Sequence, residues 1–194
     1  MLFEQTEFLI HRIRTLPQGH KICDLEMDKV VSCFESNLYN NKDVFSKKGD
    51  VSRVIGIVYS GSFKSETTDV NNKTKLRGLY YPAFNGVMVD WTSYSSGIIS
   101  DKSITAKCES IVLSISQNDL NGLCDKYPCF SNSCRGMISN SCNAREQMLL
   151  KLEDLSLAEK KLDLEEHHPG LMYKIENKDL AFICDVGKNF NKKK

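Results

Sequence analysis

The spacing of hydrophobic positions divides the chain into a helical start, a strand-rich middle and a helical end. Apolar residues keep helical spacing from Leu2 to Leu16 and from Ile22 to Phe34, which predicts two short helices. From Leu38 to Ser116, short segments rich in Val, Ile, Tyr, Phe and Thr are separated by Gly, Asn, Asp and Ser. Such punctuation is typical of a sandwich, barrel or β-roll. We expect strands at Asp43–Phe45, Arg53–Ser60, Gly61–Thr67, Lys73–Tyr81, Gly86–Asp90, Ser103–Ala106 and Ser110–Ile115.

Two glycines mark irregular positions in this middle region. Gly56 lies inside an apolar run and predicts a β-bulge, whereas Gly61 directly follows the run and predicts a turn. Both predictions rest on the backbone angles that glycine adopts and other residues avoid.

After Ser116 the pattern becomes helical. A helix is expected to begin at Gln117–Leu120 and to break at Tyr127–Pro128, because the residue before proline is disfavoured in helical geometry. A longer helix follows, with residues alternately four and three apart, as in the seam of a two-stranded helical pair: Cys134, Ile138, Ser141, Arg145, Met148, Leu152 and Leu155.

Residues 139–143 are mediocre helix formers, so this seam needs a partner for stability. The prediction is a dimer helix in which Ile138, Arg145, Met148 and Leu152 face the second copy. The alternative is that the helix packs only on its own domain.

Two more short helices are expected near the carboxyl end. Ser156 and Glu159 form a capping-box pattern that begins a helix ending near His168–Gly170, and Asn177 can cap a second helix. A tight turn at 185–187 then leads into a short basic segment, 188–194.

Composition indicates a folded protein without a strong overall charge. Hydrophobic residues make up 41% and charged residues 26% of the 194 residues, and 26 basic side chains nearly cancel 25 acidic ones. Residues 171–194 nevertheless carry six lysines against three acids. Any polyanion site is therefore local to this end, and the alternative is a solvated lysine tail.

No segment approaches the roughly 20 apolar residues of a membrane span, and Glu4, Glu7, His11 and Arg12 interrupt the first 16 residues. The sequence therefore predicts a cytoplasmic protein without a membrane partner. In that compartment the eight cysteines are expected to be thiols.

Two stretches are similar to the Crp/Fnr family of bacterial regulators, particularly its Bacteroidetes-type members. One is Asn41–Lys64 (NKDVFSKKGDVSRVIGIVYSGSFK), in which a charged hairpin and a glycine precede a strand that ends in glycine. The other is Leu155–Cys184 (LSLAEKKLDLEEHHPGLMYKIENKDLAFIC), which resembles the segment leading into the family's helix-turn-helix. The resemblance extends from about Ile22 to Lys194, with loose motifs. It implies a β-roll effector domain, a dimerisation helix and a winged-helix DNA reader.

The resemblance also locates a phosphate cassette, where cyclic-nucleotide binders carry Gly-Glu and then Arg-Ser. The corresponding places here read Val89-Asp90 and roughly Ser100–Ser103, without the glycine and without the arginine. A phosphate there would meet Asp90 and at best Lys102, which argues against cyclic-nucleotide binding. An effector of unidentified chemistry remains an option at Asp90, Trp91, Tyr94, Ser103 and Thr105, and the alternative is that Trp91 and Tyr94 only pack the roll.

The implied reader departs from the family pattern. Asp185 occupies the turn glycine's place, Gly187 occupies the helix cap, and only seven residues remain for the recognition helix. Such a short helix is marginal by itself, so its order depends on docking. If it forms, its first residues reach base edges and its last neutralise phosphates; the predicted DNA-binding residues are Lys178, Lys188, Asn189, Asn191, Lys192 and Lys193.

Cysteine and histidine chemistry gives little support to other classes of protein. Cys124, Cys129, Cys134 and Cys142 form no Cys-x-x-Cys clamp, so buried thiols are expected rather than a metal or iron–sulphur site. Oxidation of Cys134 or Cys142 at a dimer seam is the open alternative. All four histidines lie outside the strand-rich region, which argues against a cupin-like metalloenzyme. We expect no metal, no cofactor and no catalysis.

Together these patterns predict an α+β protein: an antiparallel β-roll (double-stranded β-helix) domain at 1–130, a long dimerisation helix at 131–155 and a small winged-helix/helix-turn-helix domain at 156–194. The predicted function is that of a homodimeric transcriptional regulator that binds a two-fold symmetric promoter site and does not respond to cAMP. The alternative is a dimeric sensor or scaffold whose last domain no longer reads DNA.

Overall fold

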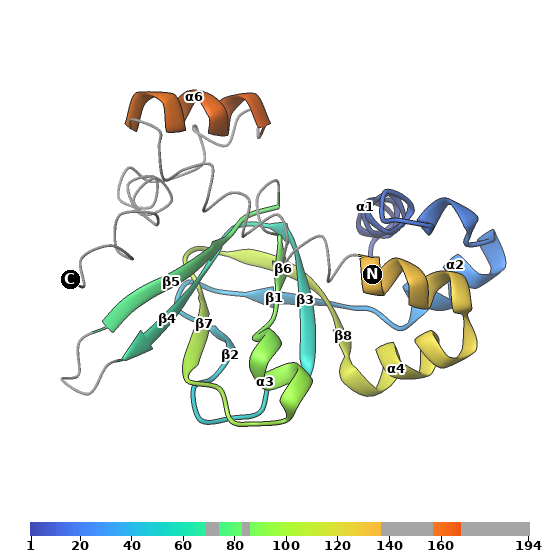
Figure 1. Cartoon of the computed structure of the whole chain (residues 1–194), viewed down its shortest axis with the longest axis horizontal. Coiled ribbons are helices and arrows are strands. Elements are labelled where there is room, and N and C mark those ends of the chain that lie inside the picture. Colours follow the sequence, from blue (N-terminus) through green and yellow to red (C-terminus); the bar gives the residue numbers. More distant parts are fainter. Residues whose placement is uncertain (69–73, 83–85, 137–156, 168–194) are drawn as a thin grey trace, which may run out of the picture. The chain divides into compact units, whose positions relative to one another are not determined.

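A computed structural model describes residues 1–68, 74–82, 86–136 and 157–167 (Figure 1). Backbone contacts divide the chain into two compact units, residues 1–137 and 138–194. Each unit is considered by itself.

The first unit is an α+β β-roll of two four-stranded antiparallel sheets. Sheet A has the strand order β1-β8-β3-β6, and sheet B has the order β2-β7-β4-β5. Sequential strands alternate between the two sheets except β4 and β5, which pair with each other in sheet B. The strands are β1 (Glu35–Tyr39), β2 (Val44–Ser46), β3 (Val54–Ser60), β4 (Phe63–Thr68), β5 (Thr74–Tyr80), β6 (Val87–Met88), β7 (Lys102–Ala106) and β8 (Ser110–Ser116).

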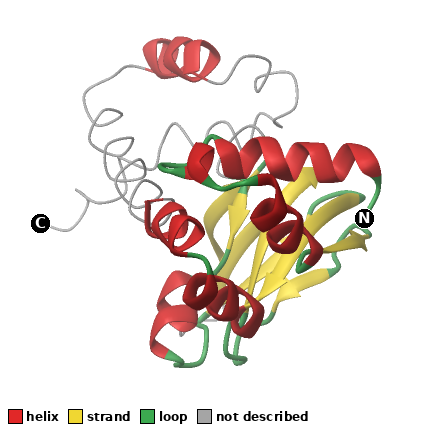
Figure 2. Cartoon of the chain, turned by 90° about the vertical axis from the view of Figure 1, so that its right-hand side faces the viewer, coloured by secondary structure: helices red, strands yellow, loops and turns green. Residues whose placement is uncertain are grey.

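Helices gather on the outer face of sheet A (Figures 1 and 2). Apolar side chains from these helices form one buried cluster with Ile55 and Ile57 of β3 and Leu113 and Ile115 of β8. We call this cluster the outer core. The helices that contribute to it are α1 (Phe3–Arg14), α2 (Asp24–Ser32), α4 (Gln117–Lys126) and the helical residues 128–136; a single 3₁₀ turn, η1 (Gly19–Lys21), separates α1 from α2.

A second cluster fills the roll between the two sheets, and we call it the inner core. Its members come from six strands: Val58, Phe63, Tyr80, Met88, Ile104, Ala106 and Val112. Tyr39 and Phe45 pack against it, and the Phe63 ring makes edge contacts with both, at centroid distances of 5.5 and 6.4 Å. Since β3 and β8 are buried on both faces, their sequences read as continuous apolar runs rather than alternating ones.

All seven predicted strands are present, with shifted ends, but β1 and the short helix α3 (Trp91–Ser96) were not predicted. The prediction for Gly61 is confirmed: its φ is +80°, and it lies in the turn between β3 and β4. The prediction of a bulge at Gly56 is wrong, because the register shift on β3 lies between Val58 and Ser60. A Cβ at position 56 would lie 2.8 Å from the Phe45 ring, so glycine is needed there for close packing of that ring.

Helix α4 begins and breaks where the sequence predicts. The Ser116 hydroxyl accepts a hydrogen bond from the Asp119 amide at 3.1 Å and caps the helix. The helix ends at Lys126, directly before Tyr127–Pro128.

In the second unit the structure describes only α6 (Leu157–His167). This helix lies where the capping-box pattern predicts one. Lys160 and Leu164, four residues apart and therefore on one face, are buried, whereas Leu162 is exposed.

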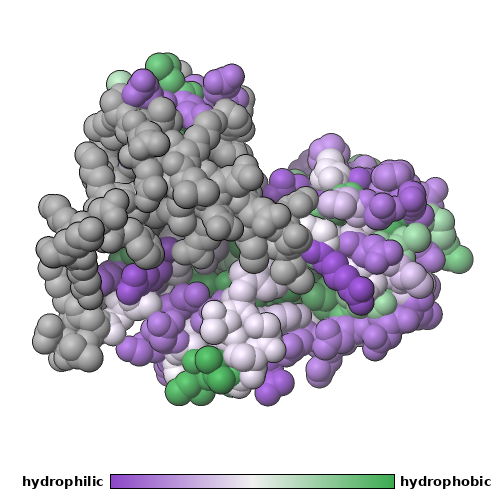
Figure 3. Space-filling model, viewed as in Figure 1, coloured by the Kyte–Doolittle hydropathy of each residue, from purple (hydrophilic) through white to green (hydrophobic). Residues whose placement is uncertain are grey.

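The view in Figure 3 shows small hydrophobic patches among mostly hydrophilic surface. Across the described residues, the exposed apolar side chains are scattered and include Phe3, Leu25, Leu38, Ile98 and Ile99. In the described part of the chain, no helix combines the length and the apolar character needed to cross a membrane.

Candidate functional site

The candidate effector site lies between β6 and β7, at the position where the resemblance implies a phosphate cassette. Residues 89–102 contain α3, a turn at Gly97 in left-handed geometry, and an extended return to β7. We call residues 90–102 the cassette. The sequence of α3, WTSYSS, is poor in good helix formers, so tertiary contacts must fix the geometry of this helix.

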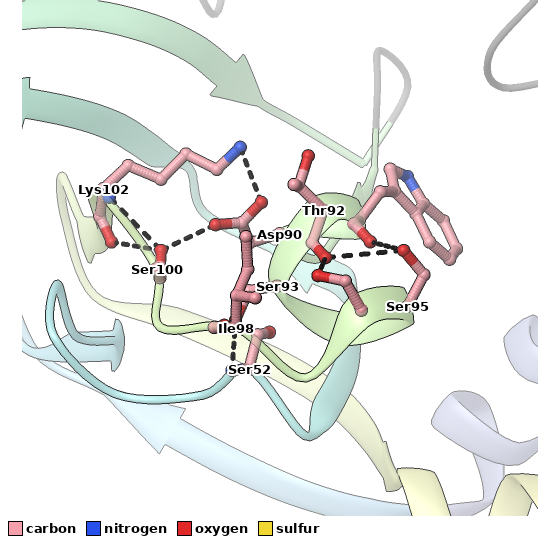
Figure 4. A network of polar contacts seen from close by, with 10 residues as sticks. Ser52, Asp90, Thr92, Ser93, Ser95, Ile98, Ser100 and Lys102 are labelled. Atoms are coloured by element: carbon pink, nitrogen blue, oxygen red, sulfur yellow. Dashed lines mark hydrogen bonds and ion pairs between the residues drawn. The ribbon is translucent and has the colours of Figure 1, made fainter.

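A buried carboxylate organises the cassette (Figure 4). Asp90 Oδ2 accepts a hydrogen bond from the Ser100 hydroxyl at 2.6 Å, and Asp90 Oδ1 lies 2.9 Å from Lys102 Nζ. No hydroxyl or amide of the described residues donates to Oδ1, so the ammonium group is its partner. The Asp90 side chain is 3% exposed and the Lys102 side chain 24%, so the pair is shielded at its acidic end.

The electrostatics of this pair favour the ionised form. Burial alone would raise the pKa of Asp90, but hydrogen bonds from Ser100 and Lys102 and the positive charge of Lys102 outweigh it. The pKa of Asp90 is therefore lowered. Asp90 is therefore ionised at neutral pH.

Serine side chains tie the cassette to the loop between β2 and β3. The Ser52 amide donates to the Ser93 hydroxyl at 2.9 Å, and that hydroxyl donates to the Ile98 carbonyl at 2.6 Å (Figure 4). Backbone hydrogen bonds join Ser100 to the same loop, through the Gly49 amide and the Asp50 carbonyl, at 2.9 Å each. Three hydrogen bonds thus hold the cassette to this loop, at Ser93 and at Ser100.

Trp91 and Tyr94 face the outer core rather than the inside of the roll. Both pack against that cluster, and their rings make an edge contact with centroids 6.1 Å apart. The Gln117 side chain donates to the Tyr94 carbonyl at 3.0 Å, which links α3 to α4. Burial, with smaller contributions from Cys124 and Cys134, raises the pKa of Tyr94 to about 12, so the phenol stays protonated. These contacts agree with a packing role for both rings.

The two remaining predicted effector residues lie on another face. Lys102, Ile104 and Ala106 alternate along β7, with the last two in the inner core, so Ser103 and Thr105 point to the opposite side of sheet B. The Ser103 hydroxyl accepts from the Lys48 amide at 3.0 Å. The structure therefore brings Asp90 together with Ser100 and Lys102, but does not bring Ser103 and Thr105 to it.

Sequence reasoning named Asp90 and Lys102 as groups that a phosphate would meet, but not as partners of each other. It missed Ser52 and Ser93 altogether. Only the density of serines between residues 93 and 103 could have indicated a hydroxyl network, and a single serine at position 52 carries no such signal.

Three of the cysteines considered for redox or metal chemistry have the surroundings of packing residues. Cys134 is buried in the outer core, and Cys124 and Cys129 pack against it partly buried. Burial, together with the nearby Cys124, raises the pKa of Cys134, so its reactive thiolate form is disfavoured. Within the described part of the chain, no three His, Cys, Asp or Glu side chains gather as a metal site would require.

The predicted dimer-helix and DNA-binding residues lie outside the described residues. They are Ile138, Arg145, Met148 and Leu152 for the helix, and Lys178, Lys188, Asn189, Asn191, Lys192 and Lys193 for the reader. Cys142 also lies outside the described residues.

The structure is similar to several solved structures. A cyclic nucleotide-binding domain from Methylobacillus flagellatus matches with a TM-score of 0.64 and 12% identity over 74% of this chain and 79% of that chain. The catabolite activator protein of Thermus thermophilus matches with a TM-score of 0.55 and 20% identity, over 87% and 79%. The N-terminal domain of a Streptomyces coelicolor transcriptional regulator gives 0.55 and 15%, over 70% and 94%.

The sequence itself matches no family model and no curated protein. At these identities the structural matches establish the fold, which is the β-roll of cyclic nucleotide-binding domains.

Proposed function

We propose that this chain is a transcriptional regulator of the Crp/Fnr type, which binds DNA as a homodimer and acts without catalysis. The observation that carries the proposal is the β-roll with its helical cover, which it shares with a catabolite activator and with the N-terminal domain of another regulator. The match to the catabolite activator spans 87% of the chain, which is more than the first unit with its 137 of 194 residues.

The sequence of the second unit supports the same proposal. Its first part carries the seam of apolar residues around Met148 and Leu152, and its end carries the lysines of residues 188–194. A regulator of this design reads a two-fold symmetric site, with half-sites one helical turn apart.

We further propose that cAMP is not the effector. Lys102 is the one basic residue of the cassette, and it is already paired with a buried carboxylate. A cyclic nucleotide would have to break this pair and bring its phosphate close to Asp90, which like-charge repulsion opposes.

The test of DNA reading is selection of bound fragments from random and genomic DNA by the purified full chain. We expect enrichment of a palindrome, and we expect Lys188→Ala/Asn189→Ala to abolish it because those side chains would contact bases. Lys29→Ala is the matched control, since it removes one positive charge from an exposed position on α2. Weak, salt-sensitive binding without sequence preference would instead favour a dimeric scaffold with a lysine tail.

The test of the dimer is sedimentation of Met148→Glu/Leu152→Glu. Charges on an apolar helical seam are expected to dissociate the dimer and to remove palindrome binding together with it. A variant that remains dimeric would show that the helix packs on its own domain instead.

A further inference from the structure

Within the cassette, Asp90 gives Lys102 the negatively charged partner that a bound anion would otherwise provide. Asp90 directly precedes α3, Ser100 follows the turn at Gly97, and Lys102 begins β7, so one carboxylate joins both ends of the thirteen-residue cassette. The Ser100 hydroxyl, which donates to Asp90, reinforces the closure by accepting a hydrogen bond from the Lys102 amide at 3.2 Å. These contacts are local to the cassette and involve only side chains and backbone of this chain.

The chain also offers an ordinary ion pair for comparison. Lys64 and Glu66 on β4 lie 2.8 Å apart, and their side chains are 36% and 28% exposed. Water can solvate both groups when that pair breaks, so it contributes little to order. In the cassette the carboxylate is almost fully buried, so losing its partner leaves an uncompensated charge away from water.

We propose that Asp90, Ser100 and Lys102 form an internal latch that holds the cassette in one arrangement without any bound ligand. The roll then has a single preferred state, and no cyclic nucleotide or phosphate is needed to order α3. This inference concerns the roll alone and does not depend on whether the chain reads DNA.

The latch makes an asymmetric prediction about its two charged members. Lys102→Met leaves the buried carboxylate without a counter-ion, which is costly. Asp90→Asn leaves Lys102, whose side chain is 24% exposed and can reach water, and the new amide can still accept from Ser100. Lys102→Met should therefore disturb the cassette more than Asp90→Asn does.

The experiment is amide hydrogen exchange on the full chain, resolved by segment, with β8 as the internal reference. We expect residues 90–102 to exchange roughly tenfold faster in Lys102→Met, and less than that in Asp90→Asn, because the latch opens locally. Lys64→Met, the matched control, should leave the cassette unchanged. Asp90→Asn/Lys102→Met should exchange more slowly than Lys102→Met, because no buried charge is left unpaired.

The same measurement with cAMP, cGMP and inorganic phosphate at millimolar concentration tests independence from ligands. A latch predicts that wild-type exchange in residues 90–102 stays unchanged in all three. Wild-type protection in Lys102→Met, or a gain of protection on adding any of the three ligands, would overturn the proposal. If Lys102→Met speeds exchange in β8 equally, the double variant must restore both segments, and failure to restore them also counts against the latch.

Discussion

The two faces of sheet A are built from the same strands but pack against different partners, helices on one side and sheet B on the other. On the outer face, aliphatic residues such as Ile57 and Leu113 pack against the covering helices, and the aromatic rings lie around the margin of this cluster. On the inner face, alternate residues of those strands meet sheet B, where aromatic rings with defined edge contacts surround Phe63. The outer core therefore holds the layer of helices against sheet A, whereas the inner core holds sheet A against sheet B.

The inside of the roll, which both sheets line, becomes polar away from the aromatic cluster. Ser65 and Thr67 continue the inward alternation of Phe63 on β4, and Thr67 pairs with Lys102 in the sheet. On sheet A, the Asn37 side chain of β1 donates to the Ser114 hydroxyl of the adjacent strand β8 at 2.9 Å. The comparison teaches that the inside of this roll is not a uniform core, and that its polar part leads to the cassette.

The largest expected effect comes from the centre of the inner core. Phe63→Ala should lower the free energy of unfolding by about 3–5 kcal/mol, because the ring is fully buried and two rings lose their contact with it. Urea denaturation measures this loss. Phe3→Ala, which removes the same ring from a 78% exposed position, is the control and should change little; equal losses would contradict the inner-core assignment.

The next effect tests the close packing beside that ring cluster. Gly56→Ala should cost about 1–3 kcal/mol, because its Cβ would lie 2.8 Å from the Phe45 ring and from Val112 Cγ1. Gly122→Ala on α4 is the control, since a Cβ there meets nothing within 4 Å. Combining Gly56→Ala with Phe45→Leu should recover part of the loss if ring crowding is the cause.

A smaller effect concerns pH and the polar part of the roll. The folded-state pKa of Asp90 is lowered, so its contribution to stability is present above the unfolded pKa, about 3.9, and is lost as pH falls through the folded value. The stability difference between wild type and Asp90→Asn should therefore shrink on acidification. Thermal unfolding between neutral pH and pH of about 3 measures it, and a difference that stays constant would contradict an ionised, stabilising Asp90.

The smallest effect is expected on the outer side of the edge strand β1. Leu38→Ala should change stability by less than about 0.5 kcal/mol, because Leu38 is 63% exposed. Leu113→Ala on β8 removes the same atoms from a fully buried position and should cost about 2–5 kcal/mol. Similar losses in the two variants would mean that another surface covers Leu38.

The strands of the roll could be predicted because apolar runs and turn residues alternate clearly along the sequence. The run at 53–60 and the glycine after it gave β3 and its turn almost residue for residue. Strand β1 was missed because Glu35–Tyr39 offers only Leu38 and Tyr39 as apolar residues, and Leu38 faces outward. Helix α3 was missed because its serines and threonine favour turns by propensity, so only its contacts make it helical.

The candidate site was less predictable than the fold. The position of the cassette and the importance of Asp90 came from the resemblance, but pairing of Asp90 with Lys102 depends on how the chain returns from α3 to β7. The grouping with Ser103 and Thr105 ignored the alternation of a strand, which sends neighbouring residues to opposite faces. The contribution of Ser52 depends on tertiary structure alone.

Trp91 is the chain's single tryptophan, and it lies on α3 within the cassette, where it packs against the outer core. Its indole is partly buried and borders Tyr94, so its emission depends on the contact of α3 with that core. The protein therefore contains its own optical probe at the segment where an effector would act. Intrinsic fluorescence can follow the cassette in the unlabelled protein, with no other indole contributing to the signal.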